Sequence, residues 1–275
     1  MKRLSRGEYF GTHYNKLILD DCTITDTEYV HEKVEWHYHE NPYFTYLIEG
    51  SVFEANKKQE YVLKPGSLLF HNCQEAHYNI KPPGYTRGFH IELNSSWFNM
   101  KDIDFNRFEG CIQLENPFIK GLMNKIFLES KINDTFSQLS VDALIVAIFD
   151  AFKYSGSELM SIKNPSWLKK LNELLIEGHV EMSLTMLSEE LQIHPVHLSR
   201  EFSKYFGSTF GQYARQMKLN KAILLINTGK FSMTEVCYMC GFYDQSHFTN
   251  AFRNFYGHTP LKVLKKIIQV KNLQF

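Results

Sequence analysis

The feature that most constrains this chain is a near-repeat close to its C-terminal end. Residues 198–209 read LSREFSKYFGST, and fifty residues later residues 248–259 read FTNAFRNFYGHT. Both copies keep the same spacing of aromatic residues, end in Gly-x-Thr, and follow a short apolar segment and a turn. This arrangement predicts two helix-turn-helix units in tandem, a module whose second helix enters the major groove of DNA.

The first unit is expected to lie between residues 183 and 206. Ser183 is placed to cap a short helix that ends near Leu191, and a turn over 192–194 follows. Pro195 suits the first position of a second helix, in which Leu198, Phe202 and Phe206 recur at helical spacing and should face inward. The side chains then predicted to face DNA are Pro195, Val196, Ser199, Arg200 and Lys204.

The second unit has clearer helix signals. Residues 232–235 (SMTE) form a capping box, Gly241 suits a tight turn, and Asp244 can cap the second helix. Gln and Asn can pair with adenine and Arg with guanine, at about 1–3 kcal/mol of discrimination for a good pair. We expect Phe248, Phe252 and Phe255 in the core, although some of the outward residues would simply be solvated. Those outward residues are Gln245, Ser246, Thr249, Asn250 and Arg253.

The distribution of charge agrees with a DNA-binding C-terminal half. Residues 1–165 contain 17 Lys and Arg and 22 Asp and Glu, a net charge of 17 − 22 = −5. Residues 166–275 contain 13 and 8, a net charge of 13 − 8 = +5. A basic half attached to an acidic half favours a polyanionic partner, double-stranded DNA. An excess of five charges is moderate, so chance scatter is the alternative interpretation.

The N-terminal part is predicted to be rich in β-strands. Short runs of β-branched and aromatic residues alternate with turn segments such as 49–50, 64–66 and 81–84. This pattern is typical of a small antiparallel barrel or sandwich. The expected strands cover residues 43–48, 51–55, 61–63, 67–70 and 88–93.

Helices are expected to follow the strands from about Pro117. The segment 141–152 is apolar on nearly every side and must be covered twice, either by a partner subunit or within its own domain. The Ser-, Gly- and Pro-containing segment 154–165 is typical of a linker. At 275 residues and 44% hydrophobic content the chain can bury two cores. We therefore expect domains at 1–153 and 166–275, an α+β chain overall.

Segments 183–206 and 232–260, including Gly241-Phe242, residues 244–246 and Gly257-x-Thr259-Pro260, resemble the AraC/XylS transcription regulators. The resemblance implies a C-terminal all-α double helix-turn-helix domain that enters successive major grooves. It also implies an N-terminal cupin-like antiparallel β-barrel for sensing and dimerisation. The resemblance therefore implies a transcription regulator, most readily an activator. It also implies that the chain forms a homodimer and contacts RNA polymerase.

The resemblance has three departures. Gln192 stands in the first turn where glycine is usual, and His194 stands where a serine-type cap is usual. We expect the first unit to lose about 1 kcal/mol of stability for this reason. Asn250 replaces a common arginine, so base preference cannot be carried over.

The strand segment that contains His37 and His39 puts both side chains on one face, and with His77 they resemble the histidines of a cupin. The glutamate of a metal-loaded cupin is missing, because Tyr43 and Phe44 stand at its place. We therefore expect no resident metal, cofactor or catalytic residue, and a small-molecule effector instead. A cupin metalloenzyme, an effector-independent DNA binder and a simple aromatic core are the alternatives. The predicted effector residues are Trp36, His37, His39, Tyr46, His77 and His90.

Five dispersed cysteines form no disulfide framework, which favours the reducing cytoplasm. Cys237 and Cys240 are one helical turn apart without a second pair, so buried packing is favoured over zinc or redox chemistry. The longest apolar run is too short to span a bilayer, and we expect no membrane association.

Overall fold

The computed structural model describes residues 1–104, 108, 110–132, 134–152, 165–176 and 183–272. It divides into two compact units. The first comprises Met1–Leu114, Lys125–Val146 and Lys265–Phe275, and the second comprises Glu115–Asn124 and Ala147–Leu264.

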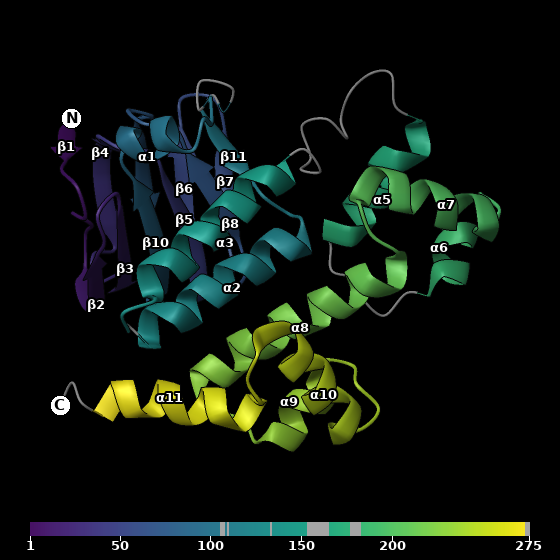
Figure 1. The fold of residues 1–275 in the computed structure, drawn as a ribbon. Helices are drawn as coiled ribbons and strands as arrows, with labels where there is room; N and C mark the ends of the chain where they lie inside the picture. Colours follow the sequence, from purple (N-terminus) through teal and green to yellow (C-terminus); the bar gives the residue numbers. More distant parts are fainter. Residues whose placement is uncertain (105–107, 109, 133, 153–164, 177–182, 273–275) are drawn as a thin grey trace. The chain divides into compact units, whose positions relative to one another are not determined.

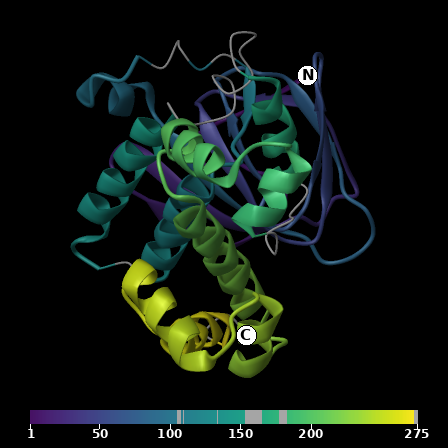
Figure 2. The same ribbon diagram turned by 90° about the vertical axis from the view of Figure 1, so that its right-hand side faces the viewer.

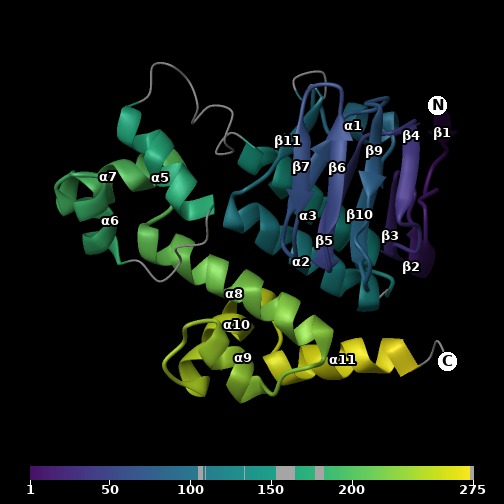
Figure 3. The ribbon, with the colours of Figure 1, turned by 180° about the vertical axis from the view of Figure 1, so that it is seen from behind.

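Two β-sheets form the body of the first unit (Figures 1 and 3). One sheet has the order β1-β4-β9-β6-β7, and the other has the order β11-β8-β5-β10-β3-β2. β1 and β4 run parallel, and the other pairings between the described strands are antiparallel. The strands are β1 (Lys2–Leu4), β2 (Thr12–Ile18), β3 (Cys22–Glu28), β4 (Lys33–His39), β5 (Tyr43–Glu49), β6 (Val52–Asn56), β7 (Glu60–Leu63), β8 (Leu68–His71), β9 (His77–Ile80), β10 (Arg87–Leu93) and β11 (Cys111–Gln113).

The five strands expected from the sequence correspond to β5, β6, β7, β8 and β10. Their hydrogen bonds form two separate ladders and not one closed barrel, so the sandwich describes the arrangement better than the barrel. The α+β fold class is confirmed.

The central strands of the six-stranded sheet are buried on both faces, since every residue of β10 is buried. Burial on both faces requires a second layer outside the sheet. Phe127 of α2 supplies part of this layer, with its ring 5.3 Å from the ring of Phe89. Trp97 Nε1 also donates a hydrogen bond to Asp142 of α3 at 3.2 Å. The helices are α1 (Ser95–Met100), α2 (Pro117–Ile132) and α3 (Ser137–Ala151).

A buried ionic group joins α2 to the sheet. Arg87 donates from Nε to Asp26 Oδ1 at 2.6 Å and from Nη2 to Oδ2 at 2.5 Å, and Lys131 pairs with the same carboxylate. Burial opposes ionisation of Asp26, but the hydrogen bonds from Arg87 and the charge of Lys131 outweigh it and lower the pKa of Asp26. The carboxylate therefore stays charged in the interior.

The second unit is helical, and the long helix α8 runs between two smaller groups of helices (Figure 2). A core of leucines and aromatic residues, centred on Leu198, Phe202 and Tyr213, holds the first group to α8. The remaining helices are α5 (Ser166–Ile176), α6 (Leu184–Glu190), α7 (Pro195–Phe206), α8 (Phe210–Thr228), α9 (Met233–Met239), α10 (Gln245–Tyr256) and α11 (Pro260–Asn272).

The expected linker at 154–165 lies almost entirely outside the described residues, so the predicted domain boundaries stay predictions. In the helix expected at 141–152, Val141, Ile145 and Ile148 are fully buried, whereas Val146 is 37% exposed. None of the described helices is both long enough and apolar enough to cross a membrane.

Candidate nucleic-acid interface and sensing cavity

α7 is the second helix of the first helix-turn-helix unit. Leu198, Phe202 and Phe206 are buried along one side, as predicted, and the rings of the two phenylalanines stack at 4.4 Å. The apolar residues recur every four positions, which leaves the opposite side of the helix in solvent. Of the predicted DNA-facing residues, Val196, Ser199, Arg200 and Lys204 are exposed and Pro195 is half-buried.

His194 caps α7, since its Nδ1 accepts a hydrogen bond from the backbone N–H of Val196 at 3.3 Å. An imidazole thus occupies the position where the resemblance leads one to expect a hydroxyl cap. The turn before it requires a left-handed residue, and Gln192 has φ 54° there. Gly241 has φ 72° in the turn of the second unit.

α10 repeats this arrangement in the second unit. Asp244 Oδ1 accepts from the backbone N–H of His247 at 2.7 Å and begins the helix. Phe248 and Phe252 are buried as predicted, but the third aromatic residue of the core is Tyr256 and not Phe255, which is only half-buried. A spacing of four residues keeps the side chains on one stripe, and Phe255 lies beside it.

The predicted DNA-facing residues of α10 lie at the surface. Gln245, Ser246, Asn250 and Arg253 are exposed and Thr249 is half-buried. Gln245 Nε2 donates to Thr234 Oγ1 of α9, so its amide is held near the start of the helix pair. In the first unit, Arg200 and Lys204 approach Glu201 at 3.7 and 3.5 Å, which are weak exposed pairs that leave both cations accessible.

Cys237 and Cys240 are buried at 0% and 3% exposure. Neither belongs to any group of possible metal ligands within the described ranges. The pair therefore packs in the core of the second unit.

A cavity opens into the first unit. His37, His39, His77 and His90 of the predicted effector set line it. Trp36 neighbours His37 along β4 and therefore points to the opposite face, where it is 38% exposed and packs against Tyr78. Tyr46 is buried but does not line the cavity. Several lining residues lie outside the predicted effector set, and they include Tyr9, Tyr29, Tyr43, Glu54, Asn79 and Lys81.

Tyr9 is the lining residue that was hardest to foresee. It precedes the recognisable strands, yet its ring stacks on His90 at 4.0 Å and lies 4.7 Å from His39. Glu54 carried a weak signal, namely a carboxylate inside a predicted strand.

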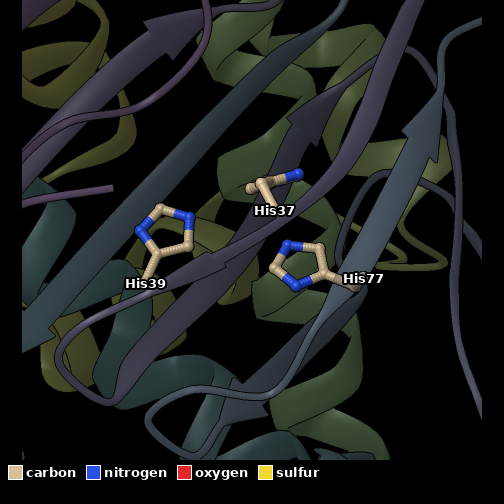
Figure 4. Close-up of side chains that lie close together, drawn as sticks. All are labelled: His37, His39 and His77. Carbon is tan, nitrogen blue, oxygen red and sulfur yellow. The ribbon is translucent and has the colours of Figure 1, made fainter. Parts of the chain in front are cut away.

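The side chains of His37 and His39 from β4 and His77 from β9 converge (Figure 4). One potential ligand atom from each lies within 4.8 Å of the others. Nδ1 of His37 donates to Glu35 O at 2.9 Å and Nδ1 of His77 to Glu75 O at 3.0 Å, which leaves each Nε2 with its lone pair. This is the orientation that metal-binding histidines commonly have. Nε2 of His77, however, also contacts the hydroxyl of Tyr43 at 3.1 Å.

The histidines of the cavity wall are uncharged near neutral pH. Burial, followed by the proximity of His77, lowers the pKa of His37 to about 4, and burial lowers the pKa of His90 to about 3. Burial raises the pKa of Glu54 to about 7. The histidines are therefore neutral and offer both hydrogen-bond donors and acceptors.

The family model that describes a helix-turn-helix domain matches residues 187–266, the part of the chain that contains α7 and α10. This is an AraC-type helix-turn-helix domain. The AraC-type domain is 32% identical over 95 residues to the transcriptional activator RhaS of Salmonella arizonae, covering 33% of this chain and 34% of the relative. It is 27% identical over 106 residues to the regulator GlxA of Rhizobium meliloti, covering 38% of this chain and 33% of that protein.

The chain thus spans about a third of the length of the curated relatives that it matches. Among solved structures, apo ToxT from Vibrio cholerae aligns over 89% of this chain and 97% of its own, with 13% identity and a TM-score of 0.39. The AraC-type domain is therefore assigned from the sequence matches alone.

Proposed function

We propose that the whole chain is a sequence-specific transcription regulator, most readily an activator, that acts in the cytoplasm. The observation that carries this proposal is the duplicated geometry of α7 and α10 inside an AraC-type domain. Each helix begins at a side-chain cap after a left-handed turn residue and exposes one polar face. Two such helices can enter successive major grooves about one helical turn, roughly 34 Å, apart.

The exposed side chains divide into two roles. Arg200 is exposed in the second turn of α7, and Gln245 is exposed as the first residue of α10. Their side chains can pair with guanine and adenine, respectively. Lys204 and Arg253 stand in the last turns and suit phosphate contacts that carry no sequence information. Specific binding would then depend on the first pair more than on the second.

The cavity of the first unit is the proposed effector site. Its aromatic rings and neutral histidines suit a small polar or aromatic metabolite. An effector that binds one conformation better would shift the population able to contact both half-sites. Because the curated relatives are matched over the AraC-type domain only, effector control is inferred from the cavity.

A homodimer and contact with RNA polymerase belong to the same proposal. Phe136 and Leu139, near the start of α3, are 70% and 72% exposed. Large apolar side chains of this kind in solvent suit an interface with a second copy of the chain.

The test is DNA affinity of the double variant Arg200→Ala, Gln245→Ala against the natural chain. Each side-chain contact to a base that is lost should weaken specific binding by about 1–3 kcal/mol, whereas binding to unrelated DNA should change little. Lys169→Ala removes an exposed cation from α5, outside both helices, and serves as the control. Unchanged affinity and sequence preference in the double variant, with the fold intact, would reject the assignment of α7 and α10.

A metal-dependent cupin enzyme is the second candidate, favoured by the anchored Nδ1 atoms of His37 and His77. Held by His37, His39 and His77, a zinc ion would supply Lewis-acid chemistry and an iron(II) ion would supply redox chemistry. Metal analysis of the variant His37→Gln, His77→Gln distinguishes this candidate, because the double substitution should abolish binding at that group.

A further inference from the structure

A second group of potential metal ligands lies in the first unit, apart from the three histidines of Figure 4. It consists of Glu54 in β6, His71 in β8 and Cys111 in β11. One ligand atom from each residue lies within 4.8 Å of the other two. Glu54 and His71 are 4% and 1% exposed and Cys111 is half-buried, so the group is largely in the interior.

The pairing of the strands brings these residues together from distant parts of the sequence. In the antiparallel ladder of β8 and β11, His71 and Cys111 are direct partners, and directly paired residues project to the same side of a sheet. Glu54 belongs to β6 in the other sheet. The group therefore spans the space between the two sheets.

His71 is unusual for a buried histidine. Within the described part of the chain, neither of its ring nitrogens has a hydrogen-bond partner. Its ring stacks on Tyr43 at a centroid distance of 4.4 Å, and its Nε2 lies 3.4 Å from Glu54 Oε1. Buried polar groups are normally satisfied, so a buried imidazole that makes no hydrogen bond and lies next to a carboxylate and a thiol indicates a missing ligand.

Glu54 is oriented for this position. Its Oε2 accepts a hydrogen bond from Asn79 Nδ2 at 2.8 Å, which leaves Oε1 on the side of His71. Hydrogen bonds that fix a carboxylate in this way are common behind metal ligands.

The donor atoms and their separation match zinc. Zinc takes carboxylate oxygen, imidazole nitrogen and thiolate sulfur in tetrahedral geometry, and metal bonds of about 2.0–2.1 Å place an oxygen and a nitrogen ligand about 3.3 Å apart. The separation of Oε1 of Glu54 and Nε2 of His71 is 3.4 Å. We propose that Glu54, His71 and Cys111 bind a zinc ion that joins the two sheets of the first unit.

The charge of the site also balances. A carboxylate and a thiolate together neutralise Zn²⁺, so the ion enters the interior without a net buried charge. Cys111 gives up its thiol proton to solvent on binding, and no electron is transferred. Three protein ligands leave one coordination position for water.

The test uses the purified full-length chain, stripped of metal with a chelator and titrated with Zn²⁺ and then with Co²⁺. We expect one zinc per chain and, with cobalt, the near-ultraviolet charge-transfer band of a thiolate ligand. Cys111→Ser should abolish the band, and His71→Phe, which keeps a ring for Tyr43, should weaken zinc binding at least about tenfold. Cys73→Ser alters a half-buried cysteine outside the group and should leave both signals unchanged.

The cobalt band separates this site from the three-histidine group, which has no sulfur ligand. No band in the natural chain, or a band that survives Cys111→Ser, would overturn the proposal. So would zinc binding that is lost in His37→Gln, His39→Gln but retained in Cys111→Ser. If Cys111→Ser does not fold, Asn79→Ala tests the site instead, because it removes the hydrogen bond that orients Glu54. This variant should bind zinc about 10–100-fold more weakly, and an unchanged affinity would reject the site. None of these outcomes depends on whether the AraC-type domain reads DNA.

Discussion

Gln192 and Gly241 adopt the same left-handed backbone conformation, with φ angles of 54° and 72°, at equivalent points of the two helix-turn-helix units. The residue after each closes the turn with a similar backbone hydrogen bond, from Ile193 to Ser188 at 2.9 Å and from Phe242 to Cys237 at 3.1 Å. Glycine enters this region freely, whereas glutamine is strained there by about 1 kcal/mol. The two turns thus have the same backbone conformation, but only the turn at Gln192 is strained.

Gln192→Gly should stabilise the first unit by about 1 kcal/mol, because it relieves this strain. Hydrogen exchange of the α6 and α7 amides measures the change locally. Gly241→Gln is the matched reverse substitution and should speed exchange in α9 and α10. Equal exchange in the natural chain and Gln192→Gly would mean that the turn carries no strain.

The cap of α10 gives a second prediction. Asp244→Ala removes the acceptor for the N–H of His247 and should destabilise the second unit by about 1 kcal/mol, whereas Asp244→Asn keeps an acceptor and should be nearly neutral. Thermal unfolding of the three proteins makes the comparison. If alanine and asparagine behave alike, the cap does not contribute through its oxygen.

The buried ionic group is expected to matter far more than any exposed pair. Asp26→Asn removes the buried carboxylate that Arg87 and Lys131 share and should lower the free energy of unfolding by about 3–5 kcal/mol. Lys101→Ala, which breaks the partly exposed pair with Asp142, should lower the free energy of unfolding by about 1 kcal/mol or less. Urea denaturation distinguishes the two, and similar losses would contradict the description of a buried charge group.

Acid sensitivity follows from His90. Its pKa is lowered to about 3 by burial, below the ordinary value of 6.5, so the folded state binds fewer protons than the unfolded state between these values. The contribution of neutral His90 to the free energy of unfolding is therefore fully present above about pH 6.5. It decreases as the pH drops toward 3, by up to about 1.4 kcal/mol per pH unit. His90→Gln should flatten the pH dependence of urea unfolding over that window. An unchanged slope would mean that His90 is not the group that titrates.

Much of the second unit was predictable because its signals are local. Ser232 and Glu235 form the capping box that their spacing predicts, and the stripes of Leu198 and Phe248 are buried. Phe255 was placed in the core wrongly because helical spacing alone does not decide between adjacent aromatic residues, and Tyr256 follows the stripe.

The first unit was predictable in its strands but less so in its cavity. Alternation along β4 placed His37 and His39 on one face, yet Tyr9 reaches them from a segment without regular structure. Likewise, Cys111 meets His71 only through the register of β8 and β11. Contacts between distant strands depend on pairing that no local pattern in the sequence specifies.

The central claim, tandem readout of DNA by α7 and α10, is tested most directly by selection of genomic DNA fragments with the purified full-length chain at near-physiological salt. Sequencing of the bound fragments should reveal a recurrent motif about two helical turns long, whose two halves are weakened separately by Arg200→Ala and Gln245→Ala. Uniform, salt-sensitive binding without a motif would contradict the claim, since it would reflect phosphate contact alone.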